Sequence, residues 1–183
     1  MAPERLTLAS RSPQRRAILE QLGIDFRVEP PDVDELAHGE PRALVLENAR
    51  RKCHSVEGER VLGVDTAVVL DGHAFGKPAD VAEATTLLRR LSGRTHEVMS
   101  AIALRRGGSE RSEVAVTGVR FRPLEDREVD WYVETGEWRG RAGGYAIQGR
   151  GAALVAAIEG DYWNVVGLPV PTLLAIAPDL LAY

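Results

Sequence analysis

A single carboxylate interrupts the most apolar stretch of the chain. Asp65 is the only charged residue between Val61 and Leu70, a run typical of a strand covered on both faces. Burying an isolated carboxylate is very costly, so it needs a cation, a metal or several hydrogen-bond donors. Asp65 is therefore either the hub of a structural hydrogen-bond network or part of an active site, and the sequence weighs the two evenly.

The hairpin that follows this strand offers a cation. Asp71-Gly72 is a turn signal, and Lys77 lies shortly beyond it. A three-residue loop would make Lys77 a diagonal neighbour of Asp65 on the same face of the sheet, whereas a two-residue turn would place it opposite Thr66 on the other face. Both registers stay open. Taken alone, a lysine in a Gly-Lys-Pro turn is more often simply exposed.

The segment that begins at Ser10 joins a β-prone run to a helical one and could bind an anion. Ser12 is a typical helix N-cap, and Pro13 fits the first helical position. Such a turn presents unpaired backbone N–H groups to a phosphate, and Arg15 could add a charged fork. An ordinary capped helix with solvated arginines is the commoner explanation. The chain has no glycine-rich Walker or dinucleotide motif.

A second acidic group lies in a loop flanked by prolines. Asp32, Asp34 and Glu35 are carboxylates of the kind that hard divalent cations such as Mg²⁺ prefer. Lys52, on the helix expected to follow, is either a point charge for a phosphate or a lysine at the edge of a buried face. In isolation, a solvated loop and a boundary lysine are the commoner explanations.

Residues 140–151 are rich in glycine, which is destabilising unless the backbone must approach a ligand or another segment closely. Within this segment Tyr145 could pack on a base, and Gln148 offers both a donor and an acceptor to a base edge. The four histidines have no metal-ligand spacing, and no Ser-His-Asp or Cys-His arrangement is recognisable. The segment therefore adds a base-binding candidate but no nucleophile.

The elements that must position these residues alternate between strands and helices. Hydrophobic periodicity and capping signals predict a mixed α/β sheet rather than a purely parallel one, because two hairpins fall in the middle of the chain. The predicted strands are 5–9, 26–29, 61–70, 97–104 and 113–121, with a small one near 154–158. The predicted helices are 13–22, 41–57, 81–91, 125–135 and 170–176.

Composition limits the class of protein. The chain has 183 residues, 23 Lys plus Arg against 27 Asp plus Glu, and 44% apolar residues. This balance argues against electrostatic binding of nucleic acid and against disorder. The single Cys53 forbids an intrachain disulfide and suits a reducing compartment. No apolar run approaches the roughly 20 residues of a membrane span, and no signal peptide is visible. We expect one cytoplasmic domain over 1–183, with no separable linker.

The order of these motifs resembles the Maf family over nearly the whole chain. Each motif is weak, but seven or more in order are a strong signal. The motifs are Leu8-Ala9-Ser10-Arg11-Ser12-Pro13-Gln14-Arg15, Asp34-Glu35, Ala49-Arg50-Arg51-Lys52, Gly63-Val64-Asp65-Thr66, Gly76-Lys77-Pro78, Leu91-Ser92-Gly93-Arg94-Thr95-His96, Ala142-Gly143-Gly144-Tyr145-Ala146-Ile147-Gln148-Gly149 and Asn164-Val165-Val166-Gly167-Leu168-Pro169.

The resemblance implies an inosine-triphosphatase-like fold, with an elongated mixed sheet, two lobes and a central cleft, commonly as a homodimer. It implies hydrolysis of a nucleoside triphosphate to the monophosphate and pyrophosphate with Mg²⁺, or with Mn²⁺ or Co²⁺. Asp65 would be the proton acceptor, and Asp65 and Glu35 would be the metal ligands. The implied catalytic set is Asp65, Glu35, Lys77, Lys52 and Arg15, and the implied substrate-binding set is Ser10, Ser12, Gln14, Thr66 and Gln148.

Specificity in the family is associated with the positions of Gln14, Thr66 and Gln148. The last two are similar to the branch that prefers dTTP and UTP, whereas Gln14 departs from the Arg usual there. A 7-methyl-GTP pyrophosphatase of the same family is the alternative. Two other classes also stay open: a non-catalytic nucleotide-binding regulator of cell division, and a phosphate-binding interaction module. Whether Asp65 is the general base or a metal ligand is not decided by the sequence.

Overall fold

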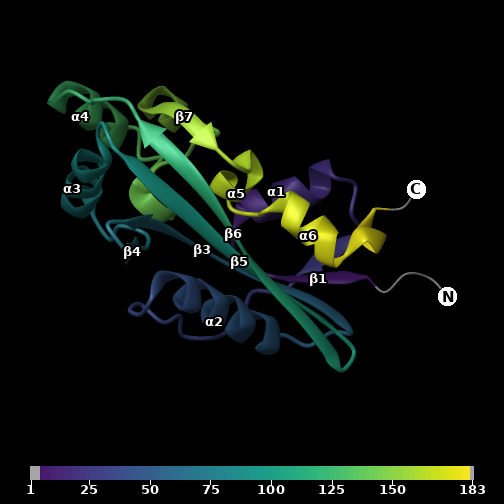
Figure 1. Ribbon diagram of the computed structural model, residues 1–183. Coiled ribbons are helices and arrows are strands. Elements are labelled where there is room, and N and C mark those ends of the chain that lie inside the picture. Colours follow the sequence, from purple (N-terminus) through teal and green to yellow (C-terminus); the bar gives the residue numbers. More distant parts are fainter. Residues whose placement is uncertain (1–4, 182–183) are drawn as a thin grey trace.

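The computed structural model describes residues 5–181 and shows a seven-stranded sheet flanked by helices (Figure 1). This confirms the predicted mixed α/β class. The strands are β1 (Leu6–Ala9), β2 (Phe26–Val28), β3 (Arg60–Leu70), β4 (His73–Phe75), β5 (Thr95–Arg106), β6 (Ser109–Phe121) and β7 (Val155–Glu159). The helices are α1 (Pro13–Gln21), α2 (Pro41–His54), α3 (Val81–Leu91), α4 (Asp126–Glu134), α5 (Tyr162–Val166) and α6 (Val170–Ile176), with 3₁₀ turns at Ala142–Gly144, Arg150–Leu154 and Pro178–Leu180.

The long strand β3 organises the sheet, whose order is β2-β1-β3-β5-β6-β7. The β1–β2 and β1–β3 pairs are parallel, and the pairs from β3 to β7 are antiparallel. One edge of β3 pairs with β5 over almost its whole length. The other edge is shared, because β1 pairs with it only as far as Gly63 and β4 only from Val68 onward. Within the described part of the chain, a short stretch of β3 between those two residues therefore has no strand beside it on that edge.

The alternation of side chains along β3 directs successive residues to opposite faces of the sheet. On one face lies the α2 core, which contains Val45, Ala49, Cys53, Val61 and Ala67. The other face carries two further cores. The α1–α6 core contains Leu8, Ile18, Leu62, Val64 and Leu173. The α3–α4 core contains Val68, Leu88, Phe121, Tyr132 and Leu154.

Most helix boundaries follow their capping residues. Ser12 accepts a hydrogen bond from the backbone at the start of α1, as the sequence predicts, and Asp80 does the same at the start of α3. Helix α2 starts at Pro41 under a Glu40 cap but ends at His54, three residues before the predicted end. The β5–β6 hairpin turns at Gly107-Gly108, so β6 begins earlier than the predicted residue 113.

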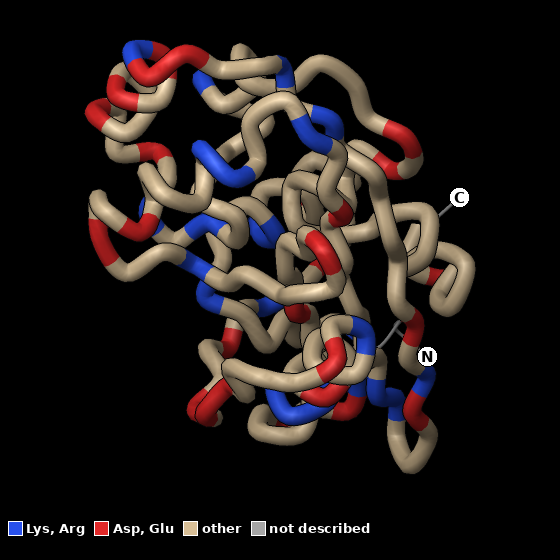
Figure 2. Tube along the Cα trace, turned by 60° about the vertical axis from the view of Figure 1, so that its left-hand side comes forward, with Lys and Arg blue, Asp and Glu red and all other residues tan. Residues whose placement is uncertain are grey.

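Charge of both signs is dispersed over the molecule. In the view of Figure 2, Lys and Arg are interspersed with Asp and Glu along most of the trace. Among the described residues, no helix is both long enough and apolar enough to cross a bilayer. The location of the protein in the cytoplasm stays a prediction.

Candidate active site

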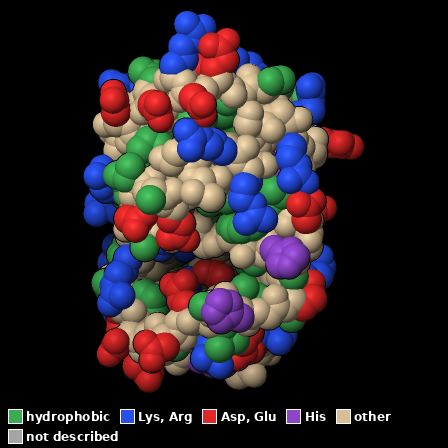
Figure 3. Space-filling view, turned by 90° about the vertical axis from the view of Figure 1, so that its left-hand side faces the viewer, with side chains coloured by type: hydrophobic (Ala, Val, Ile, Leu, Met, Phe, Trp, Pro, Cys, Tyr) green, Lys and Arg blue, Asp and Glu red, His purple; other side chains and the backbone are tan. Residues whose placement is uncertain are grey.

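A cavity of about 650 Å³ opens where the edge of β3 is unpaired. Asp65 and Thr66 lie in that unpaired stretch and point to opposite faces of the sheet, so the cavity receives side chains from both sides. Figure 3 shows a hollow across this face of the molecule with acidic side chains inside it. All ten residues of the implied catalytic and substrate-binding sets line the cavity: Ser10, Ser12, Gln14, Arg15, Glu35, Lys52, Asp65, Thr66, Lys77 and Gln148. The other two carboxylates of the acidic loop, Asp32 and Asp34, do not line it.

The acidic side of the cavity is organised around Lys52. Its Nζ lies 2.6 Å from Asp65 Oδ1 and 2.9 Å from Glu35 Oε1, so one ammonium lies between two carboxylates. Lys52 and Asp65 are almost completely buried, whereas Glu35 is about half exposed. Burial alone would raise the pKa of Glu35, but the hydrogen bond and charge of Lys52, assisted by Lys77 and Arg15, hold that pKa below its ordinary value. This carboxyl group is therefore ionised at neutral pH.

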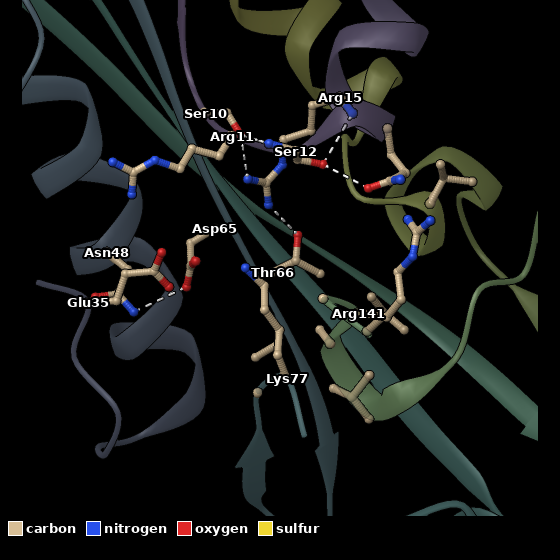
Figure 4. Close-up of a pocket in the computed structure, with 18 of the residues that line it drawn as sticks. Ser10, Arg11, Ser12, Arg15, Glu35, Asn48, Asp65, Thr66, Lys77 and Arg141 are labelled. Carbon is tan, nitrogen blue, oxygen red and sulfur yellow. Dashed lines mark hydrogen bonds between the residues drawn. The ribbon is translucent and has the colours of Figure 1, made fainter. Parts of the chain in front are cut away.

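The second oxygen of Asp65 has a partner that the sequence analysis missed. Asn48 Nδ2 lies 3.2 Å from Asp65 Oδ2 (Figure 4). Asn48 precedes Lys52 by four residues on α2, and this spacing places both side chains on one face of a helix. This four-residue spacing was the one signal in the sequence that could have linked Asn48 to Lys52. The link between Asn48 and Asp65 depends on the packing of α2 over β3, which the sequence does not show.

Arg15 anchors the opposite side of the cavity from the first turn of α1. Its guanidinium donates to Ser10 Oγ at 3.1 Å, to Thr66 Oγ1 at 3.1 Å and to the carbonyl oxygen of Gly167 at 2.9 Å. The Thr66 hydroxyl also lies 2.8 Å from Ser100 Oγ on β5. Burial lowers the pKa of Arg15, an effect that the charges of Asp65 and Glu35 oppose. The result is a fixed, buried cation at the wall of the cavity.

Lys77 enters the cavity from the loop after β4. The hairpin uses the two-residue turn Asp71-Gly72, with Leu70 opposite His73, so the three-residue alternative is wrong. Both turn residues have positive φ, 53° and 75°, as a type I′ turn requires. Strand pairing ends at Phe75, and Lys77 lines the cavity without being held in the sheet. The cation that the structure pairs directly with Asp65 is Lys52.

The glycine-rich segment closes the remaining side. Gly143 has φ of 72° and donates its N–H to the carbonyl oxygen of Gly76 at 3.0 Å. A Cβ on Gly143 would collide with the side chain of Val68, which explains the need for glycine. Tyr145 lines the cavity, but its hydroxyl lies 2.9 Å from His96 Nε2 and is therefore held inside the protein. Gln148 lines the cavity from the same segment.

Two arginines that were not among the predicted site residues also line the cavity. Arg11 follows Ser10 in the β1–α1 turn, and Arg141 lies near the start of the glycine-rich segment. Figure 4 shows them on opposite sides, with Thr66 and Lys77 between them. Burial lowers the pKa of Arg141. The cavity therefore holds more positive charge than the predicted set provides.

Comparison with known proteins identifies the family. The family model of the Maf-like proteins matches residues 5–179. The chain belongs to the Maf family.

Several Maf relatives are similar over most of both chains. A protein of Symbiobacterium thermophilum named dTTP/UTP pyrophosphatase is 53% identical over 91% of this chain and 89% of its own. Proteins with the same name from Anaeromyxobacter dehalogenans and Thermus thermophilus are 50% and 49% identical, covering 96% and 93% of this chain and 93% and 92% of their own. A solved structure, the Staphylococcus aureus Ham1 protein, aligns with a TM-score of 0.48 at 16% identity over 64% of this chain and 72% of its own, too weakly to support an argument.

The carboxylates that line this Maf cavity can bind a metal ion that a bound ligand also coordinates. Among the described residues, no group of three or more His, Cys, Asp or Glu side chains is arranged to hold a metal. The cavity offers two carboxylates, Glu35 and Asp65, facing each other across Lys52. Mg²⁺ is commonly bound by one or two carboxylates together with substrate phosphates and waters, so two protein ligands are sufficient. The residues fit a metal that arrives with a nucleotide.

Proposed function

We propose that this Maf-family protein hydrolyses nucleoside triphosphates to monophosphates and pyrophosphate, with dTTP and UTP as preferred substrates. The observation that carries the proposal is one cavity in which buried Asp65, held by Lys52, faces the cations Arg15 and Lys77. Such a combination of carboxylates and cations fits a triphosphate and a water nucleophile. The shared name of the close relatives supports both the reaction and the pyrimidine preference.

The reaction is a displacement at the α-phosphorus. A water oxygen forms a bond to that phosphorus while the bond to the bridging α–β oxygen breaks, and the electron pair leaves with pyrophosphate. Arg15, Lys52 and Lys77 would neutralise the charge that accumulates on the leaving group. The proton lost by the water passes to a base. Asp65 is the best candidate because its two oxygens are fixed by Lys52 and Asn48 and it still lines the cavity.

A divalent cation is part of the proposal, with Mg²⁺ the first choice and Mn²⁺ or Co²⁺ as alternatives. Glu35 and Asp65 would hold it together with the substrate phosphates. When bound, it supplies positive charge to the phosphate oxygens. The proposal leaves two roles for Asp65, base and metal ligand, which the experiment below separates.

The nucleoside is placed by the remaining polar residues. Gln14, Thr66 and Gln148 line the same cavity, and Gln148 can donate to and accept from a base edge. Thr66 and Gln148 are similar to the branch that prefers dTTP and UTP, whereas Gln14 departs from it, so a 7-methyl-GTP preference is kept as the alternative. We also propose a cytoplasmic homodimer without a nucleic-acid partner. Sedimentation at several concentrations tests the assembly.

In the decisive assay, the purified protein is incubated with standard or modified nucleoside triphosphates and Mg²⁺, Mn²⁺ or Co²⁺. Released pyrophosphate and inorganic phosphate are measured separately. We expect pyrophosphate and monophosphate, fastest with dTTP or UTP, and none after chelation of the metal. Diphosphate plus inorganic phosphate would place the cut elsewhere. Binding of nucleotide without turnover would favour a regulator.

Asp65→Asn tests the central residue. The change preserves shape but removes the negative charge, and general-base catalysis typically contributes about 10²–10⁴-fold, so we expect turnover to fall by that range. Circular dichroism checks that the variant is folded. If metal affinity, measured by titration in the presence of a non-hydrolysable nucleotide, is unchanged, Asp65 is the base; if it falls in parallel, Asp65 is a metal ligand. Turnover at the wild-type rate in a folded variant would reject both roles.

A further inference from the structure

Asn48 makes three side-chain hydrogen bonds while it is 3% exposed. Its Oδ1 accepts from the backbone N–H of Leu36 at 2.7 Å, and its Nδ2 donates to the carbonyl oxygen of Leu36 at 3.0 Å and to Asp65 Oδ2 at 3.2 Å. Both amide hydrogens and the amide oxygen are therefore used. Figure 4 shows Asn48 beside Asp65 and Glu35.

These contacts fix which way the amide faces. Rotating it by half a turn would place its oxygen against both the Leu36 carbonyl and the Asp65 carboxylate, replacing two attractive contacts with repulsive ones. The nitrogen must therefore face Asp65. Because Lys52 holds the other oxygen of Asp65, the carboxylate cannot rotate without losing a partner.

Asn48 also attaches the loop that carries Glu35. Residues 30–39 form neither helix nor strand. Within the described chain, the backbone hydrogen bonds of that segment are the two that Leu36 makes with Asn48. Glu35 itself contacts the rest of the site through Lys52. The position of Glu35 thus depends on two side chains of α2, one of which fixes the backbone immediately after it.

We propose that Asn48, which lines the cavity but whose polar atoms are all used by Leu36 and Asp65, is a positioning residue that sets Glu35 and Asp65 in their catalytic arrangement. The inference rests on the proposed pyrophosphatase function. It differs from a packing role because the amide joins a loop on one side to a carboxylate on the other. Loss of Asn48 should misplace the acidic groups while the phosphate-binding cations Arg15 and Lys77 stay where they are.

The kinetic test uses Asn48→Ala, with Asn48→Ser as a second variant too short to span the same partners. Partner groups that orient ligating or reacting residues typically contribute about 10–100-fold, so we expect kcat for dTTP or UTP to fall by that factor with KM within threefold of wild type. The control is Glu47→Ala. Within residues 5–181 the Glu47 side chain pairs only with Arg51, on the exposed side of α2, so this variant should leave both constants unchanged. Wild-type kcat in the Asn48 variants would overturn the inference. A fall in kcat no larger than the loss of folded protein, measured by circular dichroism, would overturn it too.

Hydrogen exchange provides a readout independent of catalysis. The Leu36 amide should exchange at least tenfold faster in Asn48→Ala than in wild type or in Glu47→Ala, with amides of β3 unchanged. Equal exchange at Leu36 would show that Asn48 does not hold the loop and would refute the inference. Failure of the wild-type protein to release pyrophosphate from any triphosphate would instead refute the proposed function, and the exchange result would still decide whether Asn48 positions the loop.

Discussion

At the scale of single residues, His96 lies behind the cavity and not in it. The side chain is 1% exposed, its ring makes edge contacts with Phe121 and Tyr145, and its Nδ1 has no partner among the described residues. Burial lowers the pKa of His96 to about 4, so it is neutral at physiological pH. Its neutral ring holds the hydroxyl of Tyr145, a residue that lines the cavity.

This burial predicts an acid sensitivity. Between pH 6.5 and 4 the unfolded chain binds a proton at His96 that the folded chain does not bind. The free energy of unfolding is therefore highest above pH 6.5 and decreases as the pH falls toward 4. Because a shift of one pKa unit corresponds to about 1.4 kcal/mol, the free energy of unfolding should fall by about 2 kcal/mol between pH 6.5 and 5. Urea unfolding at several pH values should show this slope in wild type and a flatter one in His96→Gln. Parallel slopes in the two proteins would contradict the prediction.

The residues of the site differ in how far the sequence alone revealed them. Asp65 was predictable because a lone charge in an apolar strand needs a partner. The identity of that partner was not, because Lys52 lies 13 positions away and meets Asp65 only when α2 packs across β3. The hairpin suggested Lys77 as that cation instead. Asn48 and Ser100 were missed for the same reason, since their contacts arise from packing and strand register and not from a local pattern.

At the scale of elements, the close approach of α2 to β3 sets the geometry of the acidic cluster. Gly63 makes this approach possible. A Cβ there would collide with the carbonyl oxygen of Ala49 and come within 2.6 Å of the backbone nitrogen of Cys53. Both are backbone atoms of the helix that carries Asn48 and Lys52, so they cannot yield by a side-chain rotation. The strand and helix can adopt this spacing only with glycine.

Gly63→Ala should therefore displace α2 from the sheet. Overpacking of a buried contact typically costs about 1–3 kcal/mol, and we expect a loss of unfolding free energy in that range with a lower kcat, because Lys52 and Asn48 move away from Asp65. Urea unfolding and steady-state kinetics measure the two effects. Gly108→Ala is the matched control, since its Cβ would meet open space and its φ is not positive. Equal stability of the two variants would refute this account of the α2–β3 contact.

Most elements were predictable from local signals, and the exceptions have physical causes. The Ser12 cap and Pro13 marked the start of α1, and apolar runs marked the long strands. Helix α5 was missed because five residues are too few for a periodic pattern. It is held by the Asp161 cap and by Asn164, whose side chain donates hydrogen bonds to the carbonyl oxygen of Val98 and to Thr117 Oγ1. The open edge of β3 could not be foreseen, because it results from where β1 and β4 stop pairing.

At the scale of the whole molecule, two strands connect all three cores. Val68, Leu62 and Val61 place β3 in the α3–α4, α1–α6 and α2 cores. Strand β5 does the same through Val98, Ile102 and Ala101. No core can lose its packing without disturbing strands that the others need. The cavity lies among these cores, so a ligand bound there contacts parts of each.

This connection predicts that the chain unfolds as one domain and that nucleotide stabilises all of it together. Trp138 is buried in the α3–α4 core and Trp163 packs against the α1–α6 core, so two variants that each retain one of these tryptophans report separately on the two ends. Within each variant, the thermal midpoint of the tryptophan signal should coincide with that of far-UV circular dichroism, which reports on the whole chain. A dUTP analogue with a methylene bridge between the α and β phosphates, added with Mg²⁺ at about 100 times its Kd, should stabilise by about 2.7 kcal/mol and raise both midpoints by about 5–10 °C. Disagreement between the two signals of one variant, or a shift at only one tryptophan, would show that the two ends of the sheet unfold independently, because a shared sheet cannot be stabilised at one end alone.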